Sequence, residues 1–314
     1  MDTVMEAVGL SKTFGNGVRA VDDVSLRVEA GQTVGIVGES GCGKSTTAKM
    51  LLRLLDADSG TVAFEGANIT RARGKALRSL RSRLQVVPQN PQTSLNPRRT
   101  IGDSVEFNMR VHGVARTRRR EKMRDLLARV GLDPSYATRY PHELSGGQLQ
   151  RVAIARALST EPSLVVCDEP VSALDKSVQA QVLNLLADLQ REMKVAYLFI
   201  SHDLGVVEHL ADRVLVMYLG RVVEDGAAGA LWSEALHPYT RALLSAAPGR
   251  DQERVVLRGE LPSPRSLPTG CAFRTRCPEA ESACAQEIPQ LISIGGDPTP
   301  AAHRGACVHI GQVA

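Results

Sequence analysis

The segment Gly38-Glu39-Ser40-Gly41-Cys42-Gly43-Lys44-Ser45 decides how this chain folds. Its glycines let the backbone curl so that successive N–H groups converge on an anion, and a helix beginning at its end adds the positive end of a dipole. An apolar run at 33–37 precedes the segment, and apolar residues with helical spacing follow it at 45–55. This order of strand, loop and helix predicts a binding site for a nucleoside triphosphate.

The residue types in and after this loop suit phosphate chemistry. Lys44 can reach the β and γ phosphates as a point charge, and the Ser45 hydroxyl can coordinate Mg²⁺. Asp168 ends an apolar run at 164–167, where a carboxylate is expensive unless it serves a metal. An ordinary strand-end turn is the alternative for Asp168-Glu169, and a second glycine-rich motif some twenty residues upstream argues against it.

That second motif is Leu144-Ser145-Gly146-Gly147-Gln148. It is predicted to open a helix that carries residues 150–157, so its N–H groups and the Ser145 hydroxyl form another anion site. One chain cannot easily bring this site to its own Lys44. The pair of motifs therefore points to ATP hydrolysis in a dimer.

The rest of the chain reads as a mostly parallel sheet with helices on its faces, which is an α/β fold. Helices are expected at 176–192 and 204–210, and strands at 4–9, 19–28, 33–37, 61–64, 84–87, 164–167, 195–200, 213–217 and 221–223. A helical subdomain is expected to be inserted at about 90–160. We expect one domain over 1–230, with an antiparallel β subdomain near its start, and a small irregular C-terminal extension over 231–314.

Composition indicates a globular chain of 314 residues with a full-sized core, since 43% of its residues are hydrophobic. No run approaches the roughly 18 apolar residues of a membrane span, and the first residues lack a secretory signal, so a cytosolic location is expected. Arg and Lys gather at 71–83 and 116–124, but aromatic residues are only 4% of the chain. We interpret these runs as solvated helix faces and expect no nucleic-acid partner.

Over about the first two thirds of the chain, the motifs resemble, in order and spacing, the nucleotide-binding subunit of an ATP-binding-cassette (ABC) transporter. The segments that carry the resemblance are Gly38–Ser45, Leu144–Gln148, Leu164–Glu169, Ser172–Asp175 and His202. The resemblance implies an ABC-type ATPase in which Glu169 deprotonates the attacking water and His202 senses the γ-phosphate. Gln89 would touch Mg²⁺ or that water and report the nucleotide state to a membrane partner.

The same resemblance implies a set of nucleotide-site residues. Phe14 lies where the family stacks an aromatic ring on adenine, although it could instead fill the core of the β subdomain. Mg²⁺ would be held by Ser45, Gln89 and Asp168. The full set implied to contact the nucleotide is Phe14, Gly38, Glu39, Ser40, Gly41, Cys42, Gly43, Lys44, Ser45, Thr46, Gln89, Ser145, Gly146, Gly147, Gln148, Asp168 and Asp175.

Partners follow from the resemblance as well. Two ATPase subunits, identical or homologous, would pair head to tail, so that Ser145-Gly146-Gly147 of one caps the phosphate held by the other and Asp175 links the two sites. The pair would act on two integral-membrane permeases at the cytoplasmic face of the membrane. An extracytoplasmic binding protein would deliver the substrate.

The C-terminal part narrows the subfamily. The segments 237–244, 246–248, 96–98 and 270–278 resemble the ATPases of oligopeptide, dipeptide and nickel importers. We therefore expect import of di- or oligopeptides, with nickel or another small solute as the alternative. A soluble ABC ATPase outside transport is a weaker alternative because the chain has one cassette and no sustained heptads. A regulatory nucleotide switch is disfavoured because Glu169 is present.

Cys271, Cys277, Cys284 and Cys307 lie in this proline-rich extension, which is too poor in apolar residues to fold on a core alone. Four thiolates suit zinc or an iron–sulfur cluster, and the paired Cys-x-x-Cys of zinc ribbons is missing. The resemblance implies a [4Fe-4S] cluster, with zinc or four metal-free thiols as alternatives. Cys42 and Cys167 are interpreted as a loop filler and a buried strand residue.

Overall fold

The computed structural model describes residues 2–247, 255–294 and 302–310. The chain folds into two compact units, each assembled from segments that lie far apart in the sequence. The first unit is made of residues 1–5, 28–32 and 64–200, and the second of residues 6–27, 33–63 and 201–314.

The first unit contains a run of parallel strands. β6 (Leu84–Val87) pairs with β7 (Leu164–Asp168), and β7 pairs with β8 (Ala196–Ser201). Every residue of β8 and all but the last of β7 are buried, as expected for strands covered on both faces. The register sets Val87 opposite Cys167, so the residues after β6 and at the end of β7 meet at one edge of the sheet.

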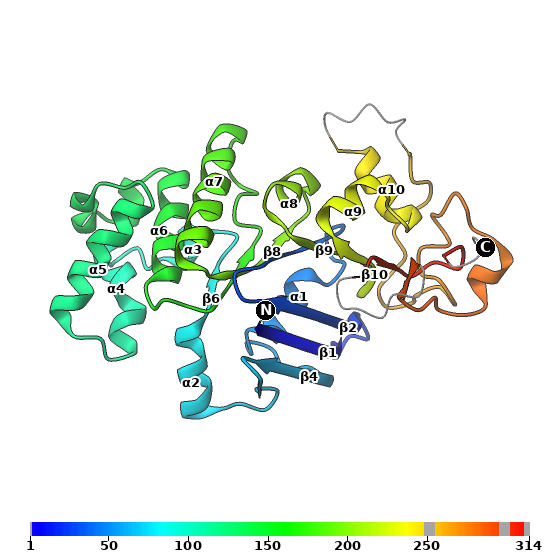
Figure 1. The fold of residues 1–314 in the computed structure, drawn as a ribbon, viewed down its shortest axis with the longest axis horizontal. Coiled ribbons are helices and arrows are strands. Elements are labelled where there is room, and N and C mark those ends of the chain that lie inside the picture. The colour runs from blue at the N-terminus through cyan, green and yellow to red at the C-terminus, as the bar shows by residue number, and fades with distance from the viewer. Residues whose placement is uncertain (1, 248–254, 295–301, 311–314) are drawn as a thin grey trace. The chain divides into compact units, whose positions relative to one another are not determined.

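Helices make up most of the remaining first unit. They are α2 (Gly74–Arg83), α3 (Pro91–Ser94), α4 (Ile101–Val111), α5 (Arg116–Arg129), α6 (Gly146–Leu158) and α7 (Lys176–Met193), with the 3-10 turns η1 (Pro134–Thr138) and η2 (Pro141–Glu143) and the short strand β5 (Ala67–Asn68). α4, α5 and α6 lie against one another (Figure 1). Their buried side chains include Val105, Leu127 and Val152. This is where a helical subdomain was expected.

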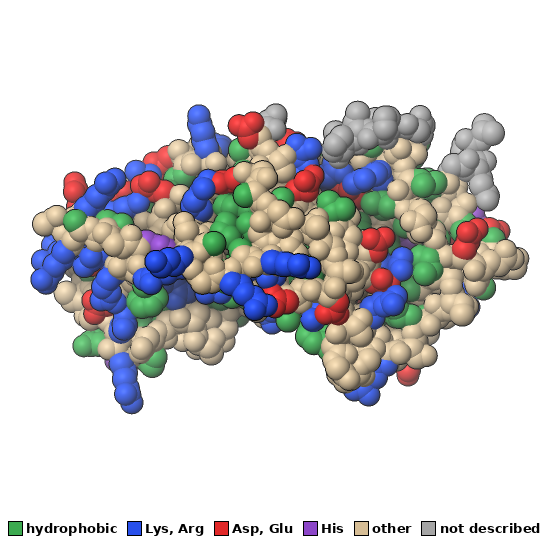
Figure 2. All heavy atoms as spheres, turned by 90° about the horizontal axis from the view of Figure 1, so that it is seen from below, with side chains coloured by type: hydrophobic (Ala, Val, Ile, Leu, Met, Phe, Trp, Pro, Cys, Tyr) green, Lys and Arg blue, Asp and Glu red, His purple; other side chains and the backbone are tan. Residues whose placement is uncertain are grey.

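The basic runs lie on solvated helices. α2 buries none of its residues, and the buried residues of α5 are Met123, Leu126 and Leu127. On the face shown in Figure 2, Lys and Arg side chains are interspersed with Asp and Glu. Among the described residues, no helix combines the length and the hydrophobicity of a membrane span.

The second unit contains a sheet near the start of the chain, in the order β2 (Arg19–Glu29), β1 (Thr3–Thr13) and β4 (Ser59–Phe64), whose strands lie side by side in Figure 1. Alternate residues of β2, such as Val24 and Leu26, are buried, so one face of the strand turns inward. The strands predicted at 4–9 and 19–28 are therefore present, and they run a few residues further than the apolar pattern indicated.

A second group of strands in this unit leads to the glycine-rich segment Gly38–Ser45, which is called the phosphate loop below. β3 (Thr33–Val37) runs parallel to β9 (Arg213–Tyr218), and β10 (Arg221–Ala227) returns antiparallel to β9. The helices of this unit are α1 (Lys44–Leu51), α8 (Leu204–Leu210), α9 (Ala228–Ser233) and α10 (Pro238–Ser245), with the 3-10 turn η3 (Ser282–Ala285).

The C-terminal extension is more ordered than the sequence suggested. β12 (Arg304–Gly305) pairs antiparallel with β10, and β11 (Ile292–Ser293) pairs with β12, so the extension continues the sheet (Figure 1). Two-residue strands are too short to show the alternation by which strands are recognised. The expectation of an irregular extension was therefore incomplete.

Two buried carboxylates on β10 hold the extension in place. Glu224 is fully buried, accepts hydrogen bonds from the backbone N–H groups of Leu236 and His237 at 2.8 and 2.8 Å, and lies 2.8 Å from Nε2 of His303. Asp225 is paired with both Arg213 and Arg304. A buried carboxylate is tolerated only when its oxygens are paired, so these contacts fix β12 against β10.

Candidate nucleotide site

The glycine-rich loop has the backbone that a phosphate cradle needs. It leaves β3 and ends where α1 begins at Lys44, with Gly38 at φ 149° and Gly43 at φ 107°. A Cβ atom at Gly38 would lie 2.2 Å from the carbonyl oxygen of Met217, and one at Gly43 would lie 2.3 Å from that of Ala20. Glycine is therefore required at both positions on grounds of conformation and of space.

Lys44 is held inside this loop. Its ammonium donates to the carbonyl oxygens of Gly38 at 2.7 Å and Glu39 at 2.9 Å, and the residue is 5% exposed. Cys42 is buried within the loop, and burial raises the pKa of its thiol. This agrees with Cys42 as a loop filler. Ser45 and Thr46 lie in the first turn of α1 and are partly exposed.

In the first unit, the structure brings Gln89 and Glu169 together. Because β6 and β7 are parallel neighbours, both residues lie at the same edge of the sheet, and the Gln89 amide donates to a Glu169 carboxylate oxygen at 2.9 Å. Glu169 has φ 46°, a left-handed conformation that is uncommon outside glycine, and its N–H donates to the carbonyl of Ile200 at 2.9 Å. Sparsely populated conformations of this kind concentrate at functional sites.

Ser145 begins α6 as its N-cap. Its hydroxyl accepts from the N–H of Gln148 at 3.4 Å, and the Gln148 side chain accepts from the N–H of Ser145 at 3.0 Å, a reciprocal capping box. Ser145 and Gly146 are exposed, while a Cβ at Gly147 would meet Val178 of α7 at 2.6 Å. The motif thus presents a helix N-terminus to the surface and packs its last glycine against α7.

Asp175 is the N-cap of α7. Its carboxylate accepts hydrogen bonds from the N–H of Val178 at 2.9 Å and from the hydroxyl of Ser177 at 2.7 Å, and the bond from Val178 is the largest cause lowering the pKa of Asp175.

Gln89 and Gly146 line one small pocket of about 140 Å³ in the first unit, together with Pro170 and Leu174. Gln89, which follows β6, and Gly146, at the start of α6, therefore lie close to each other.

His202 and Phe14 both belong to the second unit, and each lies just after the end of a strand. His202 follows the last residue of β8 and is exposed, and the next residue, Asp203, caps α8 by accepting from the N–H of Gly205 at 3.0 Å. Phe14 follows β1 in a turn and is 39% exposed. Phe14 therefore does not fill the core of the β subdomain, which removes that alternative.

The prediction of a [4Fe-4S] cluster on Cys271, Cys277, Cys284 and Cys307 is wrong. Across 2–247, 255–294 and 302–310, no group of three or more His, Cys, Asp or Glu side chains is placed to hold a metal ion, and this applies equally to the zinc alternative. Burial raises the pKa of the Cys271 and Cys307 thiols, and that of Cys277 to about 11.

The extension instead contributes apolar and charged contacts that sequence reasoning missed. Phe273 is 1% exposed and packs against Tyr218, Tyr239 and His237, with ring centroids 5.3, 5.4 and 5.5 Å away. Arg276 forms a bidentate ion pair with Glu39 of the phosphate loop. No local pattern could reveal that contact, because 237 residues separate its partners.

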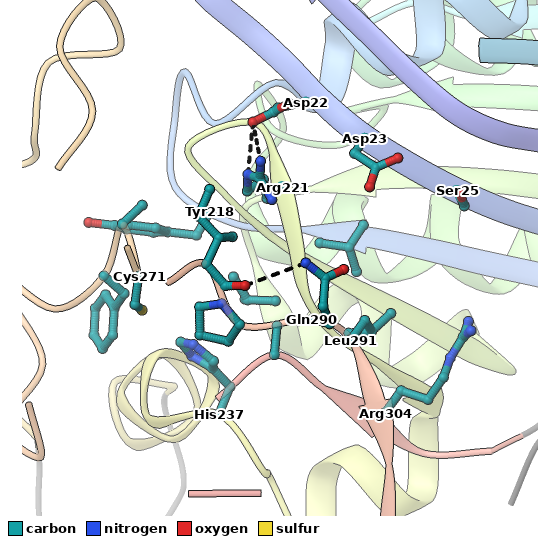
Figure 3. A pocket seen from close by; sticks show the side chains of 17 residues that line it. Asp22, Asp23, Ser25, Tyr218, Arg221, His237, Cys271, Gln290, Leu291 and Arg304 are labelled. Atoms are coloured by element: carbon teal, nitrogen blue, oxygen red, sulfur yellow. Dashed lines mark hydrogen bonds and ion pairs between the residues drawn. The ribbon is translucent and has the colours of Figure 1, made fainter. Parts of the chain in front are cut away.

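A pocket of about 240 Å³ is lined by residues of β2, β9 and β10 together with residues of the extension. Figure 3 shows its lining side chains. Its lining includes Asp22, Arg221, Cys271 and Arg304, and none of residues 38–45 is among the lining residues. Arg221 is already paired with Asp22 and Arg304 with Asp225. These two arginines are therefore compensated within the protein, and we assign no ligand to the pocket.

The comparisons with known proteins agree with this geometry. A family model described as ABC transporter matches residues 21–172, and one described as oligopeptide/dipeptide transporter, C-terminal region, matches residues 223–284. The first match and the fold define the chain as an ABC-type ATPase.

Several relatives are similar over nearly the whole chain. A probable peptide ABC transporter ATP-binding protein of Sinorhizobium fredii is 52% identical over 95% of this chain and 85% of its own length. The oligopeptide transport ATP-binding protein AppF of Bacillus subtilis is 50% identical over 90% of this chain and 88% of its own length. The chain belongs to the family of ABC-transporter ATP-binding proteins that carry this oligopeptide/dipeptide-type C-terminal region.

Solved structures share the fold. The structure of cbiO1 from Clostridium perfringens, part of an ABC transporter complex, has a TM-score of 0.69 and 28% identity, covering 74% of this chain and 92% of its own. A dimeric ATP-binding cassette bound to ADP and Pi in a post-hydrolysis state has a TM-score of 0.65 and 28% identity, covering 71% of this chain and 98% of its own.

Proposed function

We propose that this chain hydrolyses ATP to drive the import of di- or oligopeptides, with Glu169 as the general base. The observation that carries the assignment of the base is the hydrogen bond from Gln89 to Glu169 at the end of two adjacent parallel strands. It points the carboxylate and an amide into the same space, where one can accept the proton of a water and the other can orient it. Peptide import is supported by relatives about 50% identical that are named as oligopeptide transport proteins.

The chain offers suitable ligands for a magnesium-bound triphosphate. The Ser45 hydroxyl, the Asp168 carboxylate and the Gln89 amide are oxygen donors of the kind Mg²⁺ prefers. The loop from Gly38 to Gly43 has a backbone that only glycine allows at its two ends, because a Cβ at Gly38 or Gly43 would clash with the carbonyl oxygen of Met217 or Ala20. When bound, Mg²⁺ would neutralise charge developing on the phosphates. Lys44 would contribute the neighbouring positive charge, and His202 would meet the γ-phosphate.

The exposed N-terminus of α6 supports a dimeric arrangement. Ser145 and Gly146 are exposed in a capped turn, so they are accessible to a second cassette. We infer that each subunit caps the phosphate held by the other, in a head-to-tail pair of identical or homologous ATPases. Asp175, fixed as the N-cap of α7, would link the two sites.

The transport role requires partners that span the membrane. We infer that the ATPase pair docks on two permeases at the cytoplasmic face and that an extracytoplasmic binding protein selects the substrate. Reconstitution of the complete complex in liposomes, with uptake of labelled dipeptide, oligopeptide and nickel compared, tests this. ATP-dependent peptide uptake is expected, and uptake of nickel with no peptide uptake would assign the chain to the alternative substrate.

Replacement of Glu169 by glutamine tests the chemistry. The amide keeps the shape of the side chain but cannot accept a proton, so steady-state turnover should fall by about 100-fold or more while ATP still binds. Glu192→Gln is a matched control, because Glu192 is exposed and pairs with Arg129 on the surface at 2.7 Å. Turnover of Glu169→Gln close to that of the control would rule out Glu169 as the base.

A further inference from the structure

The phosphate loop is held from outside the cassette by two side chains of the C-terminal part of the chain. Arg276 donates from its two terminal nitrogens to the two carboxylate oxygens of Glu39, at 2.8 and 3.1 Å. Tyr239 of α10 accepts the backbone N–H of Glu39 at 2.9 Å through its hydroxyl oxygen. Glu39 is therefore fixed by its side chain and by its backbone at once.

The remaining polar group of Glu39 faces the site. Its carbonyl oxygen accepts from the ammonium of Lys44 at 2.9 Å. The contacts thus run from Arg276 and Tyr239, through Glu39, to the lysine of the phosphate loop. A displacement of Glu39 would move a direct partner of Lys44.

Arg276 is itself firmly placed. Its N–H donates to the carbonyl of Phe273 at 2.9 Å, closing a turn, and the ring of Phe273 is buried among Tyr218, Tyr239 and His237. Its side chain is 11% exposed, against 29% for that of Glu39. A bidentate pair on such a support holds a defined geometry, unlike the mobile ion pairs of open surfaces.

The charge of Glu39 gives this contact a consequence for ligand binding. A carboxylate in the loop that receives a polyanionic triphosphate opposes binding unless a cation compensates it. Arg276 supplies that cation from the C-terminal extension. We propose that Arg276 is a positioning residue for nucleotide binding, which fixes Glu39 and neutralises its charge so that the extension supports the phosphate loop of the same chain.

This inference rests on the proposed function of the Gly38–Ser45 loop and adds the means by which the extension acts on it. It predicts that the effect of removing Arg276 depends on the charge at position 39. Arg276→Met should weaken ATP binding by about tenfold, the scale on which one uncompensated nearby charge acts. In a chain that already carries Glu39→Gln, the same replacement should change ATP affinity by less than about twofold.

The experiment is a double-mutant cycle on the full chain. ATP affinity is measured for the original protein, Arg276→Met, Glu39→Gln and the double variant, and KM and kcat are measured in parallel. Arg274→Met is the matched control, because Arg274 lies two residues away and its guanidinium donates to the carbonyl and hydroxyl oxygens of Thr269, away from Glu39. Arg276→Lys keeps the charge and should recover most of the affinity.

The outcomes separate the possibilities. A loss confined to ATP affinity and KM, absent in Arg274→Met and suppressed by Glu39→Gln, supports the proposal. Equal effects of Arg276→Met with and without Glu39→Gln would overturn it, as would unchanged affinity in Arg276→Met. Failure of the original protein to bind ATP, or unchanged binding in Lys44→Ala, would instead refute the proposed function of the loop.

Discussion

Replacing Phe273 by alanine removes the side chain on which the C-terminal extension packs. The ring is 1% exposed and lies between Tyr218 of β9, Tyr239 of α10 and His237 at the start of α10. The neighbouring rings Tyr218 and Tyr239 are also in contact, with centroids 4.8 Å apart. The substitution therefore removes a buried ring from this cluster and enlarges the adjoining pocket, which Phe273, Tyr218 and His237 line.

The expected loss of stability follows from this packing. Burial of a phenylalanine side chain contributes about 1.5–3 kcal/mol. Each well-placed aromatic pair adds about 0.5–1.5 kcal/mol, although such contributions are not additive within one cluster. Together with the cost of an unfilled cavity, the free energy of unfolding of the second unit should fall by about 3–5 kcal/mol.

Urea unfolding combined with hydrogen exchange measures both the size and the place of this loss. Faster exchange should appear in peptides covering 255–294, while those covering β7 should keep their protection. Phe107→Ala is the control, because Phe107 is 42% exposed and stacks with Arg99 and Arg110 on the surface. A loss below about 1 kcal/mol for Phe273→Ala, or one equal to that of the control, would refute the packing argument.

Two further predictions concern the α6 motif and pH. The variant Ser145→Arg should lose ATP turnover, because the bulky cation blocks the exposed start of α6 that we propose to face a partner subunit. The phosphate loop of the variant chain should still bind ATP. Loss of ATP binding by the isolated variant would contradict this. Burial lowers the pKa of His237 to about 4, whereas an unfolded histidine titrates near 6.5. The unfolded chain binds the proton first, so stability should be complete above about pH 6.5 and fall by up to ~3 kcal/mol as the pH drops to about 4. His237→Asn keeps a capping acceptor and should flatten that dependence; an unchanged pH profile of the unfolding free energy would refute the assignment.

Local patterns predicted the elements that carry the nucleotide chemistry. The strand expected at 84–87 is β6 with the same bounds, and the helices expected at 176–192 and 204–210 are α7 and α8. These predictions were correct because the hydrophobic pattern of a buried strand or an amphipathic helix is contained within its own residues. The sequence placed Gln89 and Glu169 each after a strand, whereas their contact depends on the pairing of β6 with β7, which the folded chain shows.

The extension could not be predicted in the same way. Its four cysteines indicated a metal, but spacing along the chain does not fix the distances and thiolate character that ligation needs. The pairing of Glu39 with Arg276 and of Glu224 with His303 joins residues far apart in the sequence, and nothing near either partner marks it. Ordinary charged residues in a proline-rich segment are usually solvated, so their contacts emerged only from the folded chain.

The contacts between the extension and the phosphate loop have a thermodynamic corollary. Glu39 is hydrogen-bonded to Arg276 and Tyr239 on one side and to Lys44 on the other. The same hydrogen bonds therefore stabilise both the folded extension and the phosphate loop. Coupling between two such regions is reciprocal: if the ordered extension strengthens ATP binding by some factor, bound ATP stabilises the ordered extension by that factor. The extension is then a part of the nucleotide site in energetic terms, even though it supplies none of the residues expected to touch the phosphates.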